Sequence, residues 1–192
     1  MTSRKVVGVF LNSAVHQPHI NTLTAMTHGI RETTDNLVFL SNSTKYMDCD
    51  IAVIFGSWKD RLTKHHVLKN DIVNKHKGDL LVVETPLLGR MITEDHRYYR
   101  VGKGHYMDTL GYFNNKESNK DRWGIIRTDL GLNIKDWRKD GKHIMFLMQL
   151  PGDAATANVD ILKWLQDEIV KCKKISDRPV RVRMHPLISS YD

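Results

Sequence analysis

The sequence has few of the residues that stabilise small secreted domains. Only two of its 192 residues are cysteine, Cys49 and Cys172, and they lie far apart in the chain. They form neither a disulfide framework nor a pair of metal ligands, which predicts a reducing compartment. A chain of this length buries roughly 70% of its unfolded surface, so we expect the core to need no disulfide or metal.

Long apolar runs and repeats are absent as well. The longest apolar run near the start, Val6 to Leu11, has six residues and is followed by polar Asn12. Such a run is too short for the core of a signal peptide and far too short to cross a bilayer. The sequence therefore predicts a soluble, cytoplasmic protein without a membrane span.

Several signatures of catalysis are missing. The chain has no Gly-x-Ser-x-Gly elbow, no Gly-Lys-Ser/Thr phosphate loop and no cysteine nucleophile motif. Gly102-Lys-Gly104 lacks the third glycine and the preceding strand of a dinucleotide fingerprint. The neighbouring His65 and His66 do not share a helix face, and His16 and His19 lack a third ligand at usable spacing, so the sequence predicts no metal site. No bound cofactor is expected either.

What the chain does have is an ordinary globular composition with an excess of positive charge. It is 41% hydrophobic and 27% charged, with a net charge of +7 and a pI of about 9.4. This balance favours polyanionic partners, namely nucleic acid, nucleotide phosphates or an anionic surface. The basic residues are spread along the chain rather than gathered in one arm.

Short β-branched runs alternate with helical patterns in the first half of the chain. Strand, helix and strand in succession are typical of a parallel, doubly wound sheet, so we expect an α/β fold with a Rossmann-like sheet. The predicted strands cover residues 5–11, 36–40, 50–55 and 80–84, and the predicted helices cover residues 18–32 and 61–77.

The helix predicted over residues 61–77 has a distinct apolar pattern. Its spacing predicts that the apolar side chains point inward and that the lysine and histidine side chains point outward. Gly78 is expected to end the helix. The inward set is Leu62, Leu68, Ile72 and Val73.

Two domains are predicted. Residues 1–140 form the first, with an irregular segment rich in aromatic residues over 87–140 and a charged hinge near its end. Residues 141–192 begin a second Rossmann-like unit. Its predicted elements are a strand over 143–148, a helix over 158–174 with Ile161, Leu162, Leu165 and Ile169 inward, and a strand over 179–184.

The last predicted strand carries the most informative candidate site. Alternation along the strand places Arg181, Arg183 and His185 on one face. Pro186 ends the strand, so His185 lies at its carboxyl edge, where α/β folds bind ligands. Three cations there suit a phosphate. The alternative is an edge strand with a solvated basic face.

Two further candidates follow the other strand of this unit. If the two strands are adjacent and parallel, Gln149 and Asp153 lie at the same edge as His185. The following helix would then direct its N-terminal N–H groups to that edge. The alternative is that Pro151 to Asp153 is only a turn and that Asp153 only caps the helix.

In the first domain the carboxylate of Glu84 ends a predicted buried strand. It is a candidate general base or substrate anchor. It would equally serve to pair with Arg90 or to cap the next helix. His105, Asp108 and Asp121 are candidates by residue type alone.

Several short segments resemble those of the capsular-polysaccharide glycosyltransferases. The resemblance spans residues 50–186. The segments that carry it are His143-Ile-Met-Phe-Leu-Met-Gln-Leu-Pro-Gly-Asp153, Arg178-Pro-Val-Arg-Val-Arg-Met-His-Pro186, Phe55-Gly56 with Lys59, Leu81-Val-Val-Glu84 with Leu88-Gly-Arg90, and the aromatic stretch from Tyr98 to Phe113.

The resemblance implies a metal-independent glycosyltransferase of GT-B type, with two Rossmann-like domains facing across a cleft. Residues 1–140 would be the acceptor-side domain, and residues 141–192 would begin the domain that binds the nucleotide-sugar. His185 would contact the donor phosphate, and Arg181 and Arg183 would add positive charge. Gln149 and Asp153 would line the same site, and the base is one of Glu84, Asp108 and Asp153.

The chain departs from the family pattern in length. Only 50 residues follow Lys142, whereas a full domain needs roughly 100 or more. We therefore expect an incomplete donor site, completed by a second copy or another chain, or present as a remnant.

The acceptor is a glycan or, given the positive charge, a modified base in phage-type DNA. The competing hypotheses are a non-catalytic α/β module that binds a nucleotide or nucleic acid, and an α/β interaction domain whose cations only face solvent.

Overall fold

A computed structural model describes most of the chain. The described residues are 4–59, 62–85, 88, 98–107, 110–114, 116, 121–151, 153, 156 and 159–186. The chain divides into two compact units, Met1–Leu132 and Asn133–Asp192. The division falls close to the charged segment that the sequence analysis interpreted as a hinge.

The first unit is built on a five-stranded sheet of order β2-β1-β3-β4-β5. Four strands are parallel and β5 is antiparallel to β4. The predicted α/β class with a mostly parallel sheet is confirmed. The strands are β1 (Val6–Phe10), β2 (Leu37–Ser41), β3 (Ile51–Phe55), β4 (Asp79–Glu84) and β5 (Arg100–Lys103).

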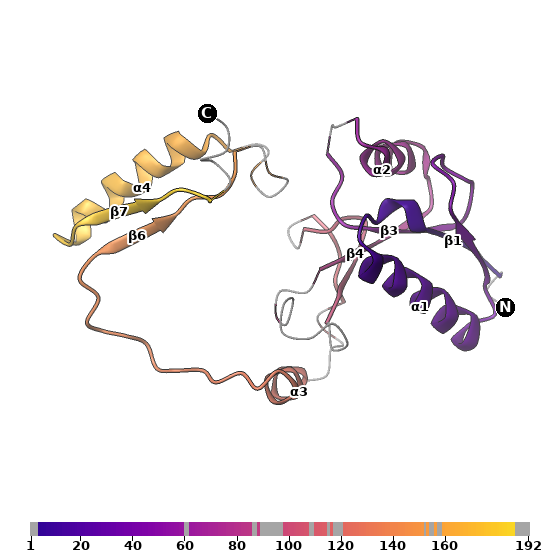
Figure 1. Ribbon diagram of the computed structural model, residues 1–192, viewed down its shortest axis with the longest axis horizontal. Coiled ribbons are helices and arrows are strands. Elements are labelled where there is room, and N and C mark those ends of the chain that lie inside the picture. Colours follow the sequence, from indigo (N-terminus) through magenta and orange to yellow (C-terminus); the bar gives the residue numbers. More distant parts are fainter. Residues whose placement is uncertain are drawn as a thin grey trace. The chain divides into compact units, whose positions relative to one another are not determined.

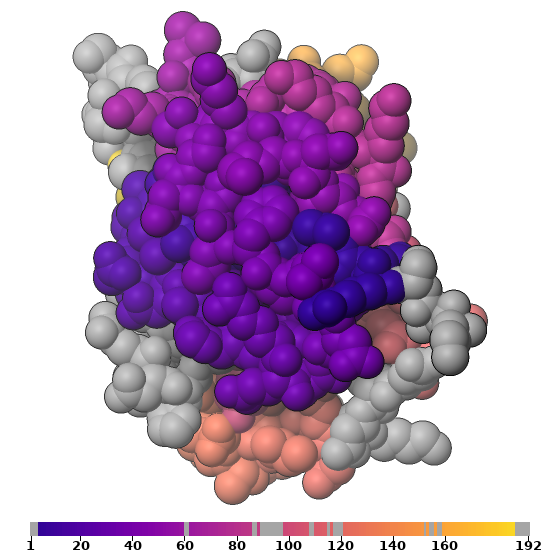
Figure 2. All heavy atoms as spheres, turned by 90° about the vertical axis from the view of Figure 1, so that its right-hand side faces the viewer, coloured from indigo at the N-terminus to yellow at the C-terminus, as the bar shows by residue number. Residues whose placement is uncertain are grey.

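Two helices cover this sheet. Helix α1 (Gln17–Thr33) and helix α2 (Lys64–Lys75) lie on opposite faces of it (Figure 1). Strands β1 and β3 are therefore buried on both sides, which explains their continuously apolar sequences. Residues from the first half of the chain, in indigo and purple, make up most of the face of this unit that Figure 2 shows.

The strand order places a topological switch point between β1 and β3. The chain leaves β1 through α1 towards β2, and it leaves β3 through α2 towards β4 on the other side. The segments after β1 and β3 therefore diverge at the carboxyl edge, where open α/β sheets bind ligands. Ser13 joins the two strand ends, because its Oγ donates to the Phe10 carbonyl (2.6 Å) and accepts from the Phe55 N–H (2.8 Å).

The prediction for the inward face of α2 is wrong in two respects. Leu62 precedes the helix and is 97% exposed, whereas His66 and Lys69, which were expected to point outward, are buried. The helix packs on the sheet, and the β2–β3 segment also contacts it, since the Tyr46 N–H donates to Asp71 (3.1 Å). Because it is covered from two sides, its buried arc is wider than a single apolar stripe.

Gly78 does not end α2 as a left-handed cap. The helix ends at Lys75, with His76 as the C-cap. A Cβ on Gly78 would instead overlap the backbone carbonyl of Asp50, which accepts the Asp79 N–H (3.0 Å). The glycine permits the close approach that starts the pairing of β4 with β3.

The segment 87–140, predicted to be irregular, contains a strand and a helix. Strand β5 pairs with β4, and helix α3 spans Arg122–Asp129. The sequence Arg100-Val-Gly-Lys103 lacks a clear apolar alternation, so its own propensity does not reveal the strand. The strand forms because β4 would otherwise have an unpaired edge, whose backbone groups form hydrogen bonds with β5. Lys103 of β5 also pairs with Asp79 of β4 (2.8 Å).

The second unit contains a strand–helix–strand arrangement, as predicted. Strands β6 (Ile144–Leu147) and β7 (Val180–Arg183) are parallel, and helix α4 (Ile161–Ile175) lies along one face of the pair (Figure 1). Trp164 packs edge-on against Phe146 at 6.0 Å. Leu162, predicted inward, is 63% exposed, because two strands are too narrow to cover the whole apolar stripe of α4.

No helix in the described part of the chain has the length and apolar character that a membrane crossing requires.

Candidate functional site

Glu84, the predicted carboxylate of the first unit, lies at the carboxyl end of β4. Its Oε1 accepts hydrogen bonds from the N–H (2.7 Å) and the Oγ1–H (2.8 Å) of Thr85. These two contacts fix the orientation of the carboxylate. The alternative partner Arg90 lies outside the described residues.

Lys69 is a charged group at the same edge that the sequence analysis missed. Its side chain reaches from α2 to the end of β3, where Nζ donates to the Phe55 carbonyl (3.3 Å). The residue is only 4% exposed. Burial is the main reason that the pKa of Lys69 is lowered to about 8; the attraction of Glu84 opposes this shift, and the repulsion of nearby Lys59 adds to it.

Gly56 lies close to both of these charged groups. It follows β3 in a left-handed conformation, with φ of 73°. The position that a Cβ would take on Gly56 is 3.8 Å from Lys69 Nζ and 4.0 Å from Glu84 Oε2. A side chain at this position would therefore contact both the ammonium group of Lys69 and the carboxylate of Glu84.

Helical spacing contains a signal that would have found Lys69. The residue is next to buried Leu68 and one turn before buried Ile72, so the buried arc of α2 includes it. The general rule that lysines face solvent outweighed this spacing in the prediction.

Aromatic and histidine rings surround the carboxyl edge of the first unit. The His19 ring stacks on Phe55, with centroids 4.0 Å apart, and Tyr99 meets both rings edge-on. Trp58 contacts the ring of His105 at 4.8 Å, and burial lowers the pKa of His105. Aromatic faces beside polar hydrogen-bonding groups suit ligands that carry both apolar and polar surface.

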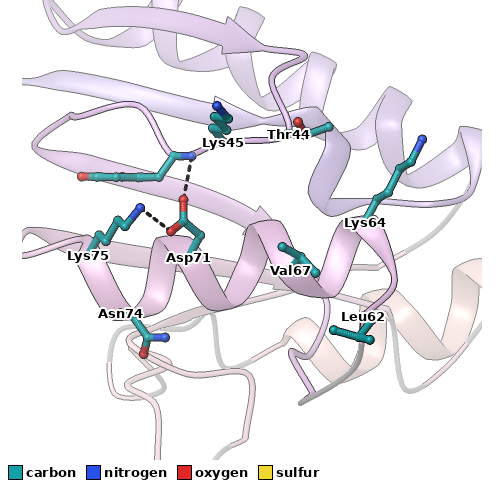
Figure 3. A pocket seen from close by; sticks show the side chains of 9 residues that line it. Thr44, Lys45, Leu62, Lys64, Val67, Asp71, Asn74 and Lys75 are labelled. Carbon is teal, nitrogen blue, oxygen red and sulfur yellow. Dashed lines mark hydrogen bonds and ion pairs between the residues drawn. The ribbon is translucent and has the colours of Figure 1, made fainter.

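A second feature of this unit is a basic groove between the segment 44–46 and α2. It has a volume of about 940 Å³, and Lys45, Lys64 and Lys75 line it (Figure 3). Asp71 lies in its wall, where it accepts the Tyr46 N–H and pairs with Lys75 at 2.6 Å. Three lysines against one carboxylate give the groove a net positive charge, which suits phosphates.

In the second unit the predicted arginines lie on an exposed sheet face. The register pairs Arg181 with Met145 and Arg183 with Leu147, and all four side chains are exposed. The opposite face of the two strands carries Phe146, which contacts α4. The cations therefore lie on the face of the sheet that points away from α4.

The structure brings Gln149 close to the end of β7. The Met148 N–H donates to the Arg183 carbonyl at 2.9 Å, so the two strand ends lie side by side. Gln149 lines a pocket of about 290 Å³ at the carboxyl end of β6, together with Leu147, Thr156 and Trp164. Apart from the Gln149 and Thr156 side chains, the lining is mostly apolar.

Asp153 lies in a turn. Its N–H donates to the Leu150 carbonyl (3.2 Å), and its own carbonyl accepts the Thr156 N–H (2.9 Å). Asp153 does not cap α4, because the helix begins at Ile161 and the side chain of Asp160 accepts the Lys163 N–H (3.0 Å). The side chain of Asp160, and not that of Asp153, therefore caps the first turn of α4.

The other predicted residues lie in different places. His185 is half-buried just beyond β7, and Asp121 is the N-cap residue of α3. Asp108 lies outside the described residues. Within the described ranges, no three histidine, cysteine, aspartate or glutamate side chains come together as metal ligands would.

No protein-family model, curated protein or solved structure matches this chain.

Proposed function

We propose that the protein is a glycosyltransferase that moves a sugar from a nucleotide-sugar to an acceptor hydroxyl. The second unit binds the nucleotide-sugar, and the first unit supplies the groups that bind the acceptor. The type of fold implied by the family resemblance, GT-B, is part of this proposal.

The observation that carries the proposal is the position of Gln149 beside the end of β7. A largely apolar pocket with one aromatic wall, Trp164, suits a flat nucleobase, and the Gln149 amide can hydrogen-bond to its edge. Arg183 ends the neighbouring strand, and an arginine can bind a phosphate with two parallel hydrogen bonds.

The chemistry of the transfer requires both parts. The bond between the sugar and the phosphate breaks more easily when cations stabilise the leaving phosphate, which is the role assigned to His185, Arg181 and Arg183. The acceptor hydroxyl needs a base, and Glu84 is a carboxylate held in a fixed orientation at a ligand-binding edge.

The test measures thermal stability of the whole chain with UDP, GDP, CMP, CDP and their sugar conjugates. A ligand at 100 times its dissociation constant stabilises the fold that binds it by about 2.7 kcal/mol, which raises its melting temperature by several degrees. We expect a shift with one nucleotide class, and loss of that shift in Arg183→Ala and in His185→Ala.

Arg138→Ala is the matched control, because it removes an exposed arginine of the same unit that pairs with Asp140. Its ligand-induced shift should equal that of the unmodified chain. If no nucleotide shifts the melting temperature, or if all three variants respond alike, the proposal is wrong.

A second candidate function is nucleic-acid binding without catalysis. The basic groove of the first unit favours it, since three lysines in one groove suit a phosphodiester backbone. Affinity for duplex DNA should then fall steeply with salt, and Lys45→Ala and Lys64→Ala should each reduce the salt slope by about 1. A flat salt dependence would exclude this function.

A further inference from the structure

Strand β7 has an outer edge that no described strand pairs with, since the sheet of the second unit has only the order β6-β7 within the described ranges. The Pro179 carbonyl accepts the Ile144 N–H (2.9 Å), so Pro179 points its backbone groups towards β6, and the carbonyl of Arg183 does the same at the end of the strand. Successive residues of a strand point these groups to alternate sides. The N–H and C=O groups of Val180 and Val182 therefore point to the outer edge.

A groove of about 640 Å³ borders this outer edge. Its floor is apolar, because Ile169 of α4 and Val180 and Val182 of β7 line it. Val182 is 41% exposed although it lies on the same face of the sheet as Phe146, which contacts α4. The outer edge and the groove together offer the backbone groups and the apolar surface that a further strand requires.

The charges around the outer edge are mostly positive. Lys173 and Arg178 line the groove, and Asp177 is the only acidic residue among its described lining residues. Arg181 and Arg183 lie on the other face of the strand and are exposed. Four cations against one carboxylate favour an anionic partner.

A second copy of this chain does not match these charges. Two antiparallel registers overlap most of β7 with the same strand of another copy, one pairing Val180 with Val182 and the other pairing Val182 with itself. The first register places Arg181 opposite Arg181 of the other copy, and the second places it opposite Arg183. Like charges directly opposite each other destabilise a strand pair.

A nucleic acid would match the charges but not the backbone groups. The N–H and C=O groups of the outer edge repeat at the spacing of a β-strand, and the backbone of another strand pairs with such a row. The partner that fits both the charges and the backbone groups is therefore a peptide.

We propose that the outer edge of β7 binds an extended, acidic peptide segment of a partner protein, which adds a strand to the sheet. Its backbone pairs with Val180 and Val182. Apolar side chains at alternate positions enter the groove, and the acidic side chains between them lie opposite Arg181 and Arg183. A guanidinium group has five N–H donors, so an arginine paired in this way retains donors for a phosphate. This inference is independent of the proposed function.

The first experiment titrates the whole chain into fluorescently labelled synthetic peptides with capped ends and measures anisotropy. In the probe, valine and glutamate alternate. One control peptide has the same residues in two blocks, which keeps the charge and removes the alternation, and in the other control valine and lysine alternate. We expect the probe to bind about 10-fold or more tightly than either control. Absence of binding, or equal binding of the two acidic peptides, would overturn the inference.

Hydrogen exchange locates the bound peptide on the chain. The amides of Val180 and Val182 should exchange about 100-fold more slowly with the probe at 100 times its dissociation constant, because exchange then requires its release. The amides of Arg181 and Arg183 point to β6 and should be protected with or without the probe. The inference fails if the valine amides do not respond to bound probe, or if protein concentration alone protects them, which would identify a second copy as the partner.

The backbone contact is tested with Val182→Pro, which removes one outward N–H group. The pairing with β6 keeps its hydrogen bonds, because that N–H points away from β6, and circular dichroism checks the fold. Affinity for the probe should fall by about 10-fold or more, since a peptide carbonyl loses its donor. Val182→Thr is the matched control, because it changes the side chain and keeps the N–H. Equal affinities of these two variants would contradict the proposed strand pairing.

Charge reversal tests the inference without altering the backbone. The double variant Arg181→Glu/Arg183→Glu should bind the probe about 10-fold or more weakly and should prefer the peptide in which valine and lysine alternate. Arg138→Glu is the matched control, because Arg138 is an exposed arginine of the same unit that pairs with Asp140, and it should retain the preference for the probe. The inference is wrong if the double variant keeps that preference or if Arg138→Glu loses it as well.

Discussion

The two units of this protein hold their positive charges in opposite ways. In the first unit, Lys69 is buried between α2 and the end of β3, and burial lowers its pKa. In the second unit, Arg181 and Arg183 lie on an open face of two strands. A buried charge interacts strongly with a few neighbours, whereas an exposed charge attracts an anionic ligand from solution. The comparison therefore separates a charge that is coupled to Glu84 and Lys59 inside the first unit from charges that stay open to solvent in the second.

The difference arises from how completely each sheet is covered. Five strands between two helices make an interior in which a lysine is removed from water. Two strands with one helix leave one face exposed, so the same kind of residue remains hydrated. Substitutions that compare equivalent positions in the two units test this explanation.

The largest effect on stability is expected from substitutions of two leucines. The helical pattern predicts that both of them point inward. Leu68 of α2 is 0% exposed, whereas Leu162 of α4 is 63% exposed. Leu68→Ala should lower the free energy of unfolding of the first unit by about 2–5 kcal/mol, because it leaves a cavity. Leu162→Ala should change that of the second unit by less than about 0.5 kcal/mol.

Hydrogen exchange of the amides in β3 and in β7 during urea titration reports the two units separately. If Leu68→Ala and Leu162→Ala lost similar amounts of free energy of unfolding, the described difference in the burial of these two leucines would be wrong.

The next largest effect on stability is expected from replacing Lys69, and it depends on pH. The pKa of Lys69 is lowered from 10.5 to about 8 in the folded chain. Below pH 8 the charged lysine therefore disfavours folding, by about 3 kcal/mol for a shift of this size. Lys69→Met should raise the free energy of unfolding at pH 7 by up to that amount. The gain should shrink as the pH rises from 8 and vanish near 10.5, where the unfolded chain also loses the proton.

Arg183→Met provides the contrast, because Arg183 is exposed. Arg183→Met should change the free energy of unfolding by less than about 0.5 kcal/mol at both pH 7 and pH 10. Urea denaturation at pH 7 and pH 10 measures both variants. A Lys69→Met variant that is less stable than the unmodified chain at pH 7 would contradict the description of Lys69 as a destabilising buried charge.

The smallest effect concerns the starts of two helices. Asp160 caps α4 through a hydrogen bond from the Lys163 N–H (3.0 Å), whereas Thr63 at the start of α2 makes no side-chain cap bond. Asp160→Ala should lower the free energy of unfolding of the second unit by about 1 kcal/mol. Thr63→Ala should lower the free energy of unfolding of the first unit by less than this. Circular dichroism during urea titration measures both losses, and a larger loss for Thr63→Ala than for Asp160→Ala would contradict the prediction.

The local order of strands and helices was predictable from short-range patterns. Apolar runs such as those around β1 and β3 need burial on both faces, so they identified the central strands. The candidate site was predictable only in part. Glu84 and Gln149 could be named because Glu84 ends an apolar strand and Gln149 follows one, and strand ends define the ligand-binding edge.

What the sequence by itself determined is the parallel α/β character and the carboxylate and amide at the strand ends, because these follow from residue spacing along a single element. The tertiary structure alone decided that Lys69 is buried, that Arg100–Lys103 forms a strand and that Leu162 stays in solvent. Burial and edge pairing depend on which elements lie opposite one another. The local pattern of a helix or strand does not contain that information, because the covering segments come from distant parts of the chain.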